Sequence, residues 1–319
     1  MVPLLEVCDL KKYFSTPYGL LHAVDGVSLT LEKGQTLGVV GESGCGKTTL
    51  GRIVLHLLES SGGRISFDGE DITTVSKAKL RQLREKMQII FQDPFSSLNP
   101  RQTISQTIGE PLVIKGGLSR EQISRRVSQL METVGLAERL VNAYPHELDG
   151  GRRQRVGVAR ALALSPQFIV CDEPVSALDV SIQAQIINLM MDLQEQLGLS
   201  YIFITHDLSV VRFISHEILV MYLGKMIEKA ASKELFEHPL HPYTQALLAA
   251  VPEPNIHSHR QKVLLQGELS SPINPMPGCR FAPRCPHAKD MCKQVQPAWE
   301  EIRPGHCVAC HAVREINGV

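Results

Sequence analysis

Short apolar runs alternate along this chain with stretches that carry apolar residues at helical spacing, which predicts buried strands and the helices that pack on them. The predicted strands are residues 4–8, 24–31, 64–67, 87–91, 168–171 and 201–205. The predicted helices are residues 103–140, with a capping box at Ser119 and Gln122, 150–164 and 181–197. Residues 11–14 and the proline-rich stretch 93–100 are predicted to be loops. Strands that alternate with helices in this way predict an α/β fold with a mostly parallel sheet.

A glycine-rich turn joins the apolar run at 35–40 to a predicted helix. Residues 41–49 fit G-x-x-x-x-G-K-[ST], in which backbone N–H groups cradle the phosphates of a nucleotide. Glycine is needed because only a residue without Cβ lets the chain wrap tightly around an anion, and the helix N-terminus adds partial positive charge. Lys47 is expected to reach the β- and γ-phosphates, and Thr48 to bind Mg²⁺. The residues expected to hold the nucleotide are Gly41, Ser43, Gly44, Cys45, Gly46, Lys47, Thr48 and Thr49.

The composition mainly excludes certain classes of protein. The 319 residues include 33 Lys and Arg against 33 Asp and Glu, so the chain lacks the broad basic surface of a nucleic-acid-binding protein. No apolar stretch is long enough to span a membrane, and no signal peptide is expected. An ATP site implies the cytosol, where disulfides are rare, so the eight cysteines need another explanation. Cys45 and Cys171 are interpreted as small apolar fillers, whereas five cysteines follow residue 278.

Four further features follow the phosphate-binding turn. They are Gln92, the stretch Leu-Asp-Gly-Gly-Arg-Arg-Gln-Arg at 148–155, the pair Asp172-Glu173 at the end of a predicted strand, and His206. In this order they resemble the ATP-binding subunit of an ABC transporter, and the resemblance covers residues 1–250. The set is specific, because a glycine pair before a basic helix is not a general feature of NTPases. The resemblance implies a P-loop NTPase (ABC ATPase) fold with a helical subdomain at about residues 95–165.

The resemblance also implies a role for each residue. Glu173 would be the general base that orients the attacking water, Gln92 would sense Mg²⁺ and that water, and His206 would contact the γ-phosphate. Mg²⁺ would be held by Thr48, Gln92 and Asp172. Phosphoryl transfer needs such parts, because it depends on positioning and electrostatics more than on covalent help. Taken singly, Asp172 would more simply be a helix cap and His206 a satisfied loop histidine.

Further contacts to the nucleotide are implied on either side of the phosphates. Phe14 would stack on the adenine, with Tyr13 as the rival. Such ATPases work as pairs, and the turn Asp149-Gly150-Gly151 would face the ATP held by the other subunit. The family generally has Ser in place of Asp149 and commonly has Gln in place of Arg152. Asp is a good N-cap, but its charge would meet the γ-phosphate, so two unequal sites and a different partner chain are expected.

From residue 252 the chain becomes proline-rich, which predicts a boundary between a domain at 1–251 and an extension at 252–319 that is too short for its own core. Residues 91–101, 241–248 and 278–286 resemble the oligopeptide and dipeptide importers with their nickel and glutathione relatives. In that branch the tail cysteines look like ligands of a [4Fe-4S] cluster. By this similarity the ligands are Cys279, Cys285, Cys292 and Cys310, with Cys307 as an extra thiol beside the fourth. A structural Zn²⁺ is the rival, although zinc sites usually show two close ligand pairs.

The sequence therefore predicts an ATP-hydrolysing subunit that powers the import of peptides or similar small solutes. It would lie on the cytoplasmic face of the inner membrane with a second ATPase chain, two membrane-spanning permease subunits and, indirectly, an extracytoplasmic solute-binding protein, and would bind no nucleic acid. The alternative is a soluble ABC-type ATPase of DNA repair or translation, disfavoured because the chain has neither two cassettes nor a coiled-coil insertion. A third hypothesis adds a redox sensor in the tail that gates the ATPase. The cargo is not predicted, because the solute-binding protein and the permease choose it.

Overall fold

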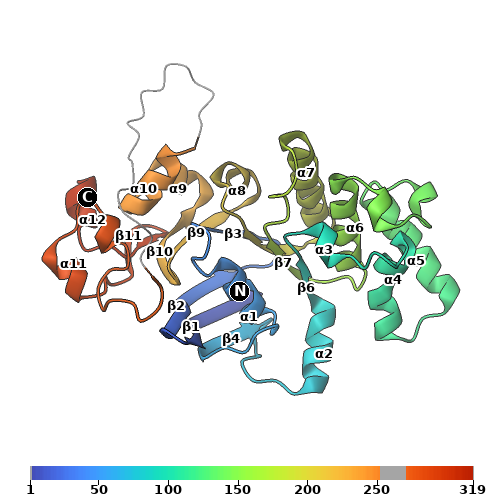
Figure 1. Ribbon diagram of the computed structural model, residues 1–319, viewed down its shortest axis with the longest axis horizontal. Coiled ribbons are helices and arrows are strands. Elements are labelled where there is room, and N and C mark those ends of the chain that lie inside the picture. Colours follow the sequence, from blue (N-terminus) through green and yellow to red (C-terminus); the bar gives the residue numbers. More distant parts are fainter. Residues whose placement is uncertain (1, 252–270, 319) are drawn as a thin grey trace. The chain divides into compact units, whose positions relative to one another are not determined.

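The computed structural model describes residues 2–251 and 271–318 (Figure 1). Contacts within the chain divide these residues into two compact units, which are described one at a time. The first unit contains residues 2–32, 36–74, 205–251 and 271–318. The second unit contains residues 33–35 and 75–204. In the part of the chain that is described, no helix combines the length and the apolarity needed to span a membrane.

The first unit begins with a long β-hairpin. Strands β1 (Leu5–Thr16) and β2 (Gly19–Leu31) pair antiparallel, and β4 (Gly62–Phe67) and β5 (Glu70–Asp71) complete a sheet in the order β2-β1-β4-β5. The strands predicted at 4–8 and 24–31 are too short, and the loop predicted at 11–14 is wrong, because these residues continue β1 and Phe14 lies opposite Leu21. Most residues in this part of the hairpin are only partly buried, so no apolar alternation marks the strand in the sequence.

The second sheet of the first unit holds much of its apolar core. Its strands, in order, are β11 (Glu300–Arg303), β12 (His306–Val308), β10 (Lys225–Ala231), β9 (Glu217–Tyr222) and β3 (Thr36–Val40). β3 and β9 run parallel, whereas the other neighbours in this series run antiparallel. The helices of the unit include α1 (Lys47–Val54), α8 (Leu208–Ile214), α9 (Ser232–Glu237), α10 (Pro242–Ala249), α11 (Asp290–Gln294) and α12 (Val313–Asn317).

The second unit combines parallel strands with helices. Strands β8 (Ser200–Ile204), β7 (Phe168–Asp172) and β6 (Met87–Ile90) pair in that order. The helices include α2 (Lys77–Lys86), α3 (Pro94–Ser97), α4 (Ile104–Lys115), α5 (Arg120–Thr133), α6 (Gly150–Leu162) and α7 (Val180–Leu197). The strands, α6 and α7 begin and end close to their predicted bounds, and the predicted parallel pairing is confirmed.

Three predictions for the second unit need correction. The stretch 103–140, predicted to be helical, forms two α-helices separated at Gly116 and Gly117, whose φ angles of +78° and +83° no helix continues through. The capping-box start predicted at Ser119 and Gln122 is confirmed, because it begins α5. The stretch 93–100 contains the short helix α3, because Asp93 caps it and a proline fits its first position. Helix α2 was not predicted, since Leu83 is its only buried residue in this highly charged segment.

The tail is held by the first unit. Phe281 is buried and packs edge-on against Tyr222 and Tyr243, with ring centroids 5.3 and 5.4 Å apart. The predicted boundary at 252 lies outside the described residues, so the division into 1–251 and 252–319 stays a prediction, as does the helical subdomain at 95–165. Phe281 of the tail belongs to the cluster built on β9 and α10, so this part of the tail shares the core of the first unit.

A buried hydrogen bond between Glu228 and His306 joins β12 to β10. The Glu228 carboxylate of β10 and the His306 ring of β12 are both fully buried, and His306 Nε2 lies 2.7 Å from Glu228 Oε1. The same carboxylate accepts hydrogen bonds from the backbone N–H groups of Leu240 at 2.6 Å and His241 at 2.9 Å. A buried polar group is costly unless it is hydrogen-bonded, so the tail supplies a partner that Glu228 needs.

Candidate functional site

The phosphate loop, residues 41–49, leaves β3 and enters α1, as its motif requires. The Lys47 ammonium is buried and donates hydrogen bonds to the carbonyl oxygens of Gly41 at 2.7 Å and Glu42 at 3.0 Å. Cys45 lies beside it, and burial raises the pKa of the Cys45 thiol. Cys171 is also fully buried, so both cysteines fit their interpretation as fillers. A lysine held in this way at a helix N-terminus is positioned to receive an anion.

Two glycines of the loop are required by the neighbouring backbone. A Cβ on Gly41 would lie 2.2 Å from the carbonyl oxygen of Met221, and one on Gly46 would lie 2.0 Å from that of Ala23. Both glycines have positive φ angles, +151° and +104°. Glycine is therefore needed here for two reasons. β2 and β9 already occupy the space that a side chain would fill, and the loop must approach an anion closely.

In the second unit, a carboxylate pair stands where β7 ends. Asp172 is the last residue of β7 and is buried, and Glu173 follows it with a φ of +47°, a conformation that few residues other than glycine adopt. The Glu173 N–H donates to the Ile204 carbonyl oxygen at 2.9 Å, which holds this backbone in place. Gln92, just past the neighbouring strand β6, donates from Nε2 to Glu173 Oε2 at 3.0 Å. An exposed amide and a carboxylate in contact at the carboxyl ends of parallel strands can hold a water molecule between them and a ligand.

The glycine pair of the second unit begins α6. Asp149 is the N-cap and accepts a hydrogen bond from the Arg152 N–H at 2.8 Å, which confirms the predicted cap. The Arg152 guanidinium also lies 3.3 Å from the Asp149 carboxylate, so part of its charge is compensated within the turn. A Cβ on Gly151 would lie 2.6 Å from the Ile182 side chain, so the start of α6 packs closely on α7. The Arg153 side chain is directed toward Pro145, where its Nε donates to the carbonyl oxygen at 2.8 Å.

The two aromatic candidates for adenine stacking differ in their contacts. The Tyr13 ring lies 4.2 Å from the His22 ring, and its hydroxyl donates to Asp25 at 2.6 Å. Burial and this hydrogen bond raise the pKa of Tyr13 to about 12. Phe14 is half-buried in β1 with the Lys12 ammonium 5.0 Å from its ring centroid. The choice of Phe14 over Tyr13 stays a prediction, as does the role of His206, which is exposed just after β8.

Four tail cysteines share one environment, and Cys307 has another. Burial, followed by the nearby Cys279, Cys285 and Cys292 thiols, raises the pKa of Cys310 to about 11. Burial and the Glu301 carboxylate raise the pKa of Cys307, where none of these four thiols contributes. Within the described residues, however, no group of three or more His, Cys, Asp or Glu side chains is arranged to hold a metal ion. The predicted cluster is therefore not established by this geometry.

Backbone N–H groups point at the sulfurs of these four cysteines. The N–H of Phe281 interacts with Cys279, that of His287 with Cys285 and that of Ala312 with Cys310. The Lys289 N–H donates to Cys292 Sγ at 3.5 Å. Hydrogen bonds to sulfur favour the thiolate form, which is the form that binds metals and iron–sulfur clusters. Burial nevertheless raises the pKa of Cys279, Cys285 and Cys310, so these hydrogen bonds do not by themselves make a metal site.

A buried strand, a glycine loop with a buried lysine, and a following helix define a P-loop nucleotide-binding protein. Comparison with known proteins narrows this class. The family model described as "ABC transporter" matches residues 24–176, and the one described as "Oligopeptide/dipeptide transporter, C-terminal region" matches residues 227–292. The chain belongs to the ABC transporter ATP-binding subunits, in the oligopeptide and dipeptide branch, and is an ATPase of that family.

The relatives and solved structures support this assignment over almost the whole chain. The oligopeptide transport ATP-binding protein AppF of Bacillus subtilis (strain 168) is 52% identical over 97% of both chains. The dipeptide transport ATP-binding protein DppF of Escherichia coli (strain K12) is 48% identical over 98% of this chain and 95% of its own. The cassette MJ0796 bound to ADP and Pi has a TM-score of 0.66 at 28% identity over 72% of this chain and 98% of its own. CbiO1 from Clostridium perfringens has a TM-score of 0.67 at 29% identity over 75% and 92%. The predicted fold and family are confirmed, and these relatives do not support the alternative in DNA repair or translation.

Three residues at the phosphate loop, Glu42, Tyr243 and Arg284, had no role that could be predicted from the sequence. The Glu42 N–H donates to the Tyr243 hydroxyl at 2.8 Å, and the Glu42 carboxylate pairs with Arg284 at 2.8 and 3.1 Å. Tyr243 and Arg284 lie in the segments 241–248 and 278–286, which the sequence marked only as typical of the importer branch. This resemblance was the available signal in the sequence. It does not identify Glu42, which lies 242 residues from Arg284.

Proposed function

We propose that this ATPase powers the import of peptides across the cytoplasmic membrane. The observation that carries the proposal is the near full-length similarity to oligopeptide and dipeptide transport ATP-binding proteins, which includes the C-terminal region. The chain would act peripherally on the cytoplasmic face of the inner membrane. It would pair with a second ATPase chain on two membrane-spanning permease subunits, with a solute-binding protein delivering the cargo from outside, and without a nucleic-acid partner.

The proposed chemistry assigns a task to each predicted residue. Lys47 and the loop N–H groups bind the phosphates, and Phe14 stacks on the adenine. Thr48, Gln92 and Asp172 would hold Mg²⁺, which neutralises charge that develops on the phosphates. Glu173, oriented by its hydrogen bond from Gln92, accepts the proton of the attacking water. His206 would contact the γ-phosphate and report its presence.

Uptake of a labelled peptide tests the proposed function. Cells that lack this chain are expected to lose ATP-dependent uptake of a labelled di- or oligopeptide and to regain it with the parental chain. A Lys47→Ala copy is expected to restore none, because it removes the charge that contacts the phosphates. Uptake of an unrelated sugar in the same cells is the control. Peptide uptake at the parental rate without the chain would contradict the proposal.

We also propose that the two ATP sites of the assembly are unequal. Asp149 is 60% exposed on its side chain and caps the helix that would meet the other subunit's ATP, so a carboxylate would stand beside a γ-phosphate. Arg152 pairs with Asp149 and would offset only part of this repulsion. The partner is then a different chain whose own turn carries the more usual residue.

Substitution of Asp149 is expected to raise the ATPase rate of the assembled transporter. Asp149→Ser and Asp149→Asn both remove the charge and keep an oxygen that can cap α6, so each is expected to raise turnover by up to about twofold, as the slow site becomes active. Steady-state phosphate release measures the rate, and Asp149→Ala separates the loss of the cap from the loss of charge. An unchanged rate, with both sites occupied and turning over, would contradict unequal sites.

The cysteine set Cys279, Cys285, Cys292 and Cys310 is proposed to hold a [4Fe-4S] cluster, with structural Zn²⁺ as the alternative. The shared environment of these thiols and the backbone N–H groups aimed at their sulfurs support the proposal. Cys307 lies among Glu301, Lys229 and Glu217 and is left out of the set. Such a group would be structural here, because it would join α11 and the end of β12 to the segment that packs on the core.

A further inference from the structure

The segment at 279–285 sends three side chains into the first unit between two of the cysteines. Arg280 reaches Asp25 of β2 and the Leu223 carbonyl oxygen, Phe281 enters the aromatic cluster with Tyr222 and Tyr243, and Arg284 reaches Glu42 of the phosphate loop. The sequence marks this segment, but the proposed cluster uses only its terminal cysteines, Cys279 and Cys285. The three side chains between them require a separate explanation.

Arg284 makes a two-pronged contact with the phosphate loop. Its Nη1 lies 2.8 Å from Glu42 Oε2, and its Nη2 lies 3.1 Å from Glu42 Oε1. Nη1 also donates to the Tyr222 hydroxyl at 3.3 Å. The Arg284 and Glu42 side chains are only 9% and 23% exposed, so solvent screens this pair less than a surface ion pair. The two parallel hydrogen bonds fix the orientation of the carboxylate as well as neutralising it.

Glu42 connects Arg284 to the lysine that would bind the phosphates. Its N–H donates to the buried Tyr243 hydroxyl at 2.8 Å, and its carbonyl oxygen accepts from Lys47 Nζ at 3.0 Å. All of its polar groups are therefore held, one of them by Lys47 itself. Without Arg284 the carboxylate would be an uncompensated negative charge within the loop that must accept the phosphate anion, and repulsion at such distances is appreciable.

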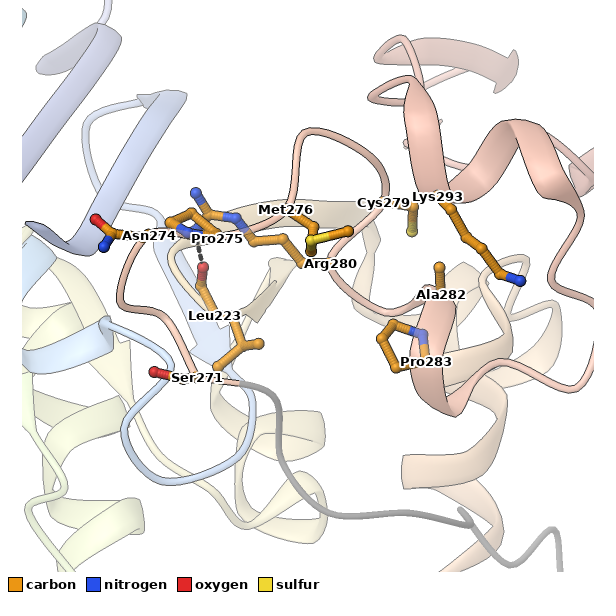
Figure 2. A pocket seen from close by; sticks show the side chains of 10 residues that line it. All are labelled: Leu223, Ser271, Asn274, Pro275, Met276, Cys279, Arg280, Ala282, Pro283 and Lys293. Carbon is orange, nitrogen blue, oxygen red and sulfur yellow. Dashed lines mark hydrogen bonds between the residues drawn. The ribbon is translucent and has the colours of Figure 1, made fainter. Parts of the chain in front are cut away.

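Arg280 provides a second link to the same loop. It donates to Asp25 and to the Leu223 carbonyl oxygen, and the next residue, Gly224, donates its N–H to the Cys45 carbonyl oxygen at 2.8 Å. Figure 2 shows Arg280 reaching Leu223, with Cys279 lining the same pocket of about 360 Å³. The two arginines, each directly following or preceding a cysteine, thus hold the loop at Glu42 and near Cys45.

We propose that Arg284 is a positioning residue for ATP binding, which holds and neutralises the Glu42 carboxylate so that Lys47 and the loop can accept the phosphates. The tail would then be part of the nucleotide site. The state of the cysteine set would affect phosphate binding at the loop through the segment 279–285. The inference rests on the proposed role of Lys47 in binding ATP, but it holds for iron, zinc or free thiols alike.

Nucleotide affinity of the full-length chain tests the inference. Arg284→Gln is expected to raise the Kd for a non-hydrolysable Mg-ATP analogue by about tenfold, while its metal content and melting temperature stay parental. In a Glu42→Gln background the same Arg284→Gln change is expected to cost less than about twofold, because the carboxylate that must be neutralised is gone. Arg303→Gln is the matched control, since Arg303 also joins the tail to a glutamate, Glu234, at 2.9 Å, but away from the phosphate loop.

A substitute variant and two further outcomes also test the role of Arg284. If Arg284→Gln does not fold, Arg284→Lys replaces it, with an expected loss of about threefold that also disappears in the Glu42→Gln background. A parental Kd for the Arg284 variant, or an equal loss with and without the Glu42 carboxylate, overturns the inference. A parental chain that binds no nucleotide would instead overturn the proposed function, so the two failures are distinguishable.

Discussion

Glu173→Gln is expected to lower the ATP turnover of the assembled transporter by roughly 10²–10⁴-fold while nucleotide binding persists, the range that a general base contributes. The amide keeps the shape of the side chain and can still contact Gln92, whose Nε2 lies 3.0 Å from Glu173 Oε2. It cannot accept a proton from water, so the loss should appear in kcat and not in the Kd for ATP. Phosphate release and equilibrium binding of Mg-ATP measure the two quantities.

Glu195→Gln provides the matched control, because Glu195 is an exposed glutamate of α7 in the same unit and should leave turnover unchanged. Gln92→Ala is expected to lower kcat by less than Glu173→Gln, since it removes the group that orients the base and leaves the base itself. Hydrolysis by the Glu173→Gln transporter at the parental rate would show that Glu173 is not the base.

Cys310→Ser is expected to abolish the metal content of the tail, whereas Cys307→Ser should preserve it. The parental chain, prepared without oxygen, should be brown and contain about four irons. Cys310 shares the environment of Cys279, Cys285 and Cys292, while Cys307 faces Glu301 and Lys229, so only the first substitution removes a ligand of the proposed set. Iron and acid-labile sulfide analysis, with the visible absorption spectrum, measures the outcome.

Cys307→Ser is the matched control for Cys310→Ser, because both substitutions are conservative and lie three residues apart in the tail. Colourless protein with about one zinc would replace the cluster by a structural zinc site. Loss of metal in Cys307→Ser but not in Cys310→Ser would contradict the proposed ligand set.

The buried strands of this protein could be predicted because they are continuous apolar runs. β6, β7 and β8 are parallel strands, and Phe168–Asp172 and Ser200–Ile204 are buried at every position, a pattern that needs no knowledge of partners. The long hairpin could not be predicted in the same way, because Lys11 and Lys12 extend β1 through backbone pairing with β2 and without an apolar face. The glycine pair Gly116-Gly117 marks the break after α4 in the sequence, and α5 begins after it.

The residues of the candidate site also fall into those that the sequence reveals and those that it does not. Motif residues such as Lys47 and Glu173 are found from the sequence because phosphate binding and hydrolysis dictate residue types at fixed spacing. The bond from Gln92 to Glu173 joins residues 81 positions apart, and the pair of Arg284 with Glu42 joins residues 242 apart. Hydrogen bonds and ion pairs between distant segments follow no spacing rule, so only the folded chain reveals them.

The position of β12 late in the chain has a consequence for protein synthesis. His306 is made 78 residues after Glu228, and β11, whose Glu300, Glu301 and Arg303 make it a short charged edge, is made just before it. Until both strands leave the ribosome, β10 presents an unpaired edge and its carboxylate lacks the imidazole partner. Unpaired edges of nascent chains invite pairing with other chains. The second unit has all its residues once residue 204 is made, whereas the first remains open to such encounters until β12 has been translated, about a hundred residues later.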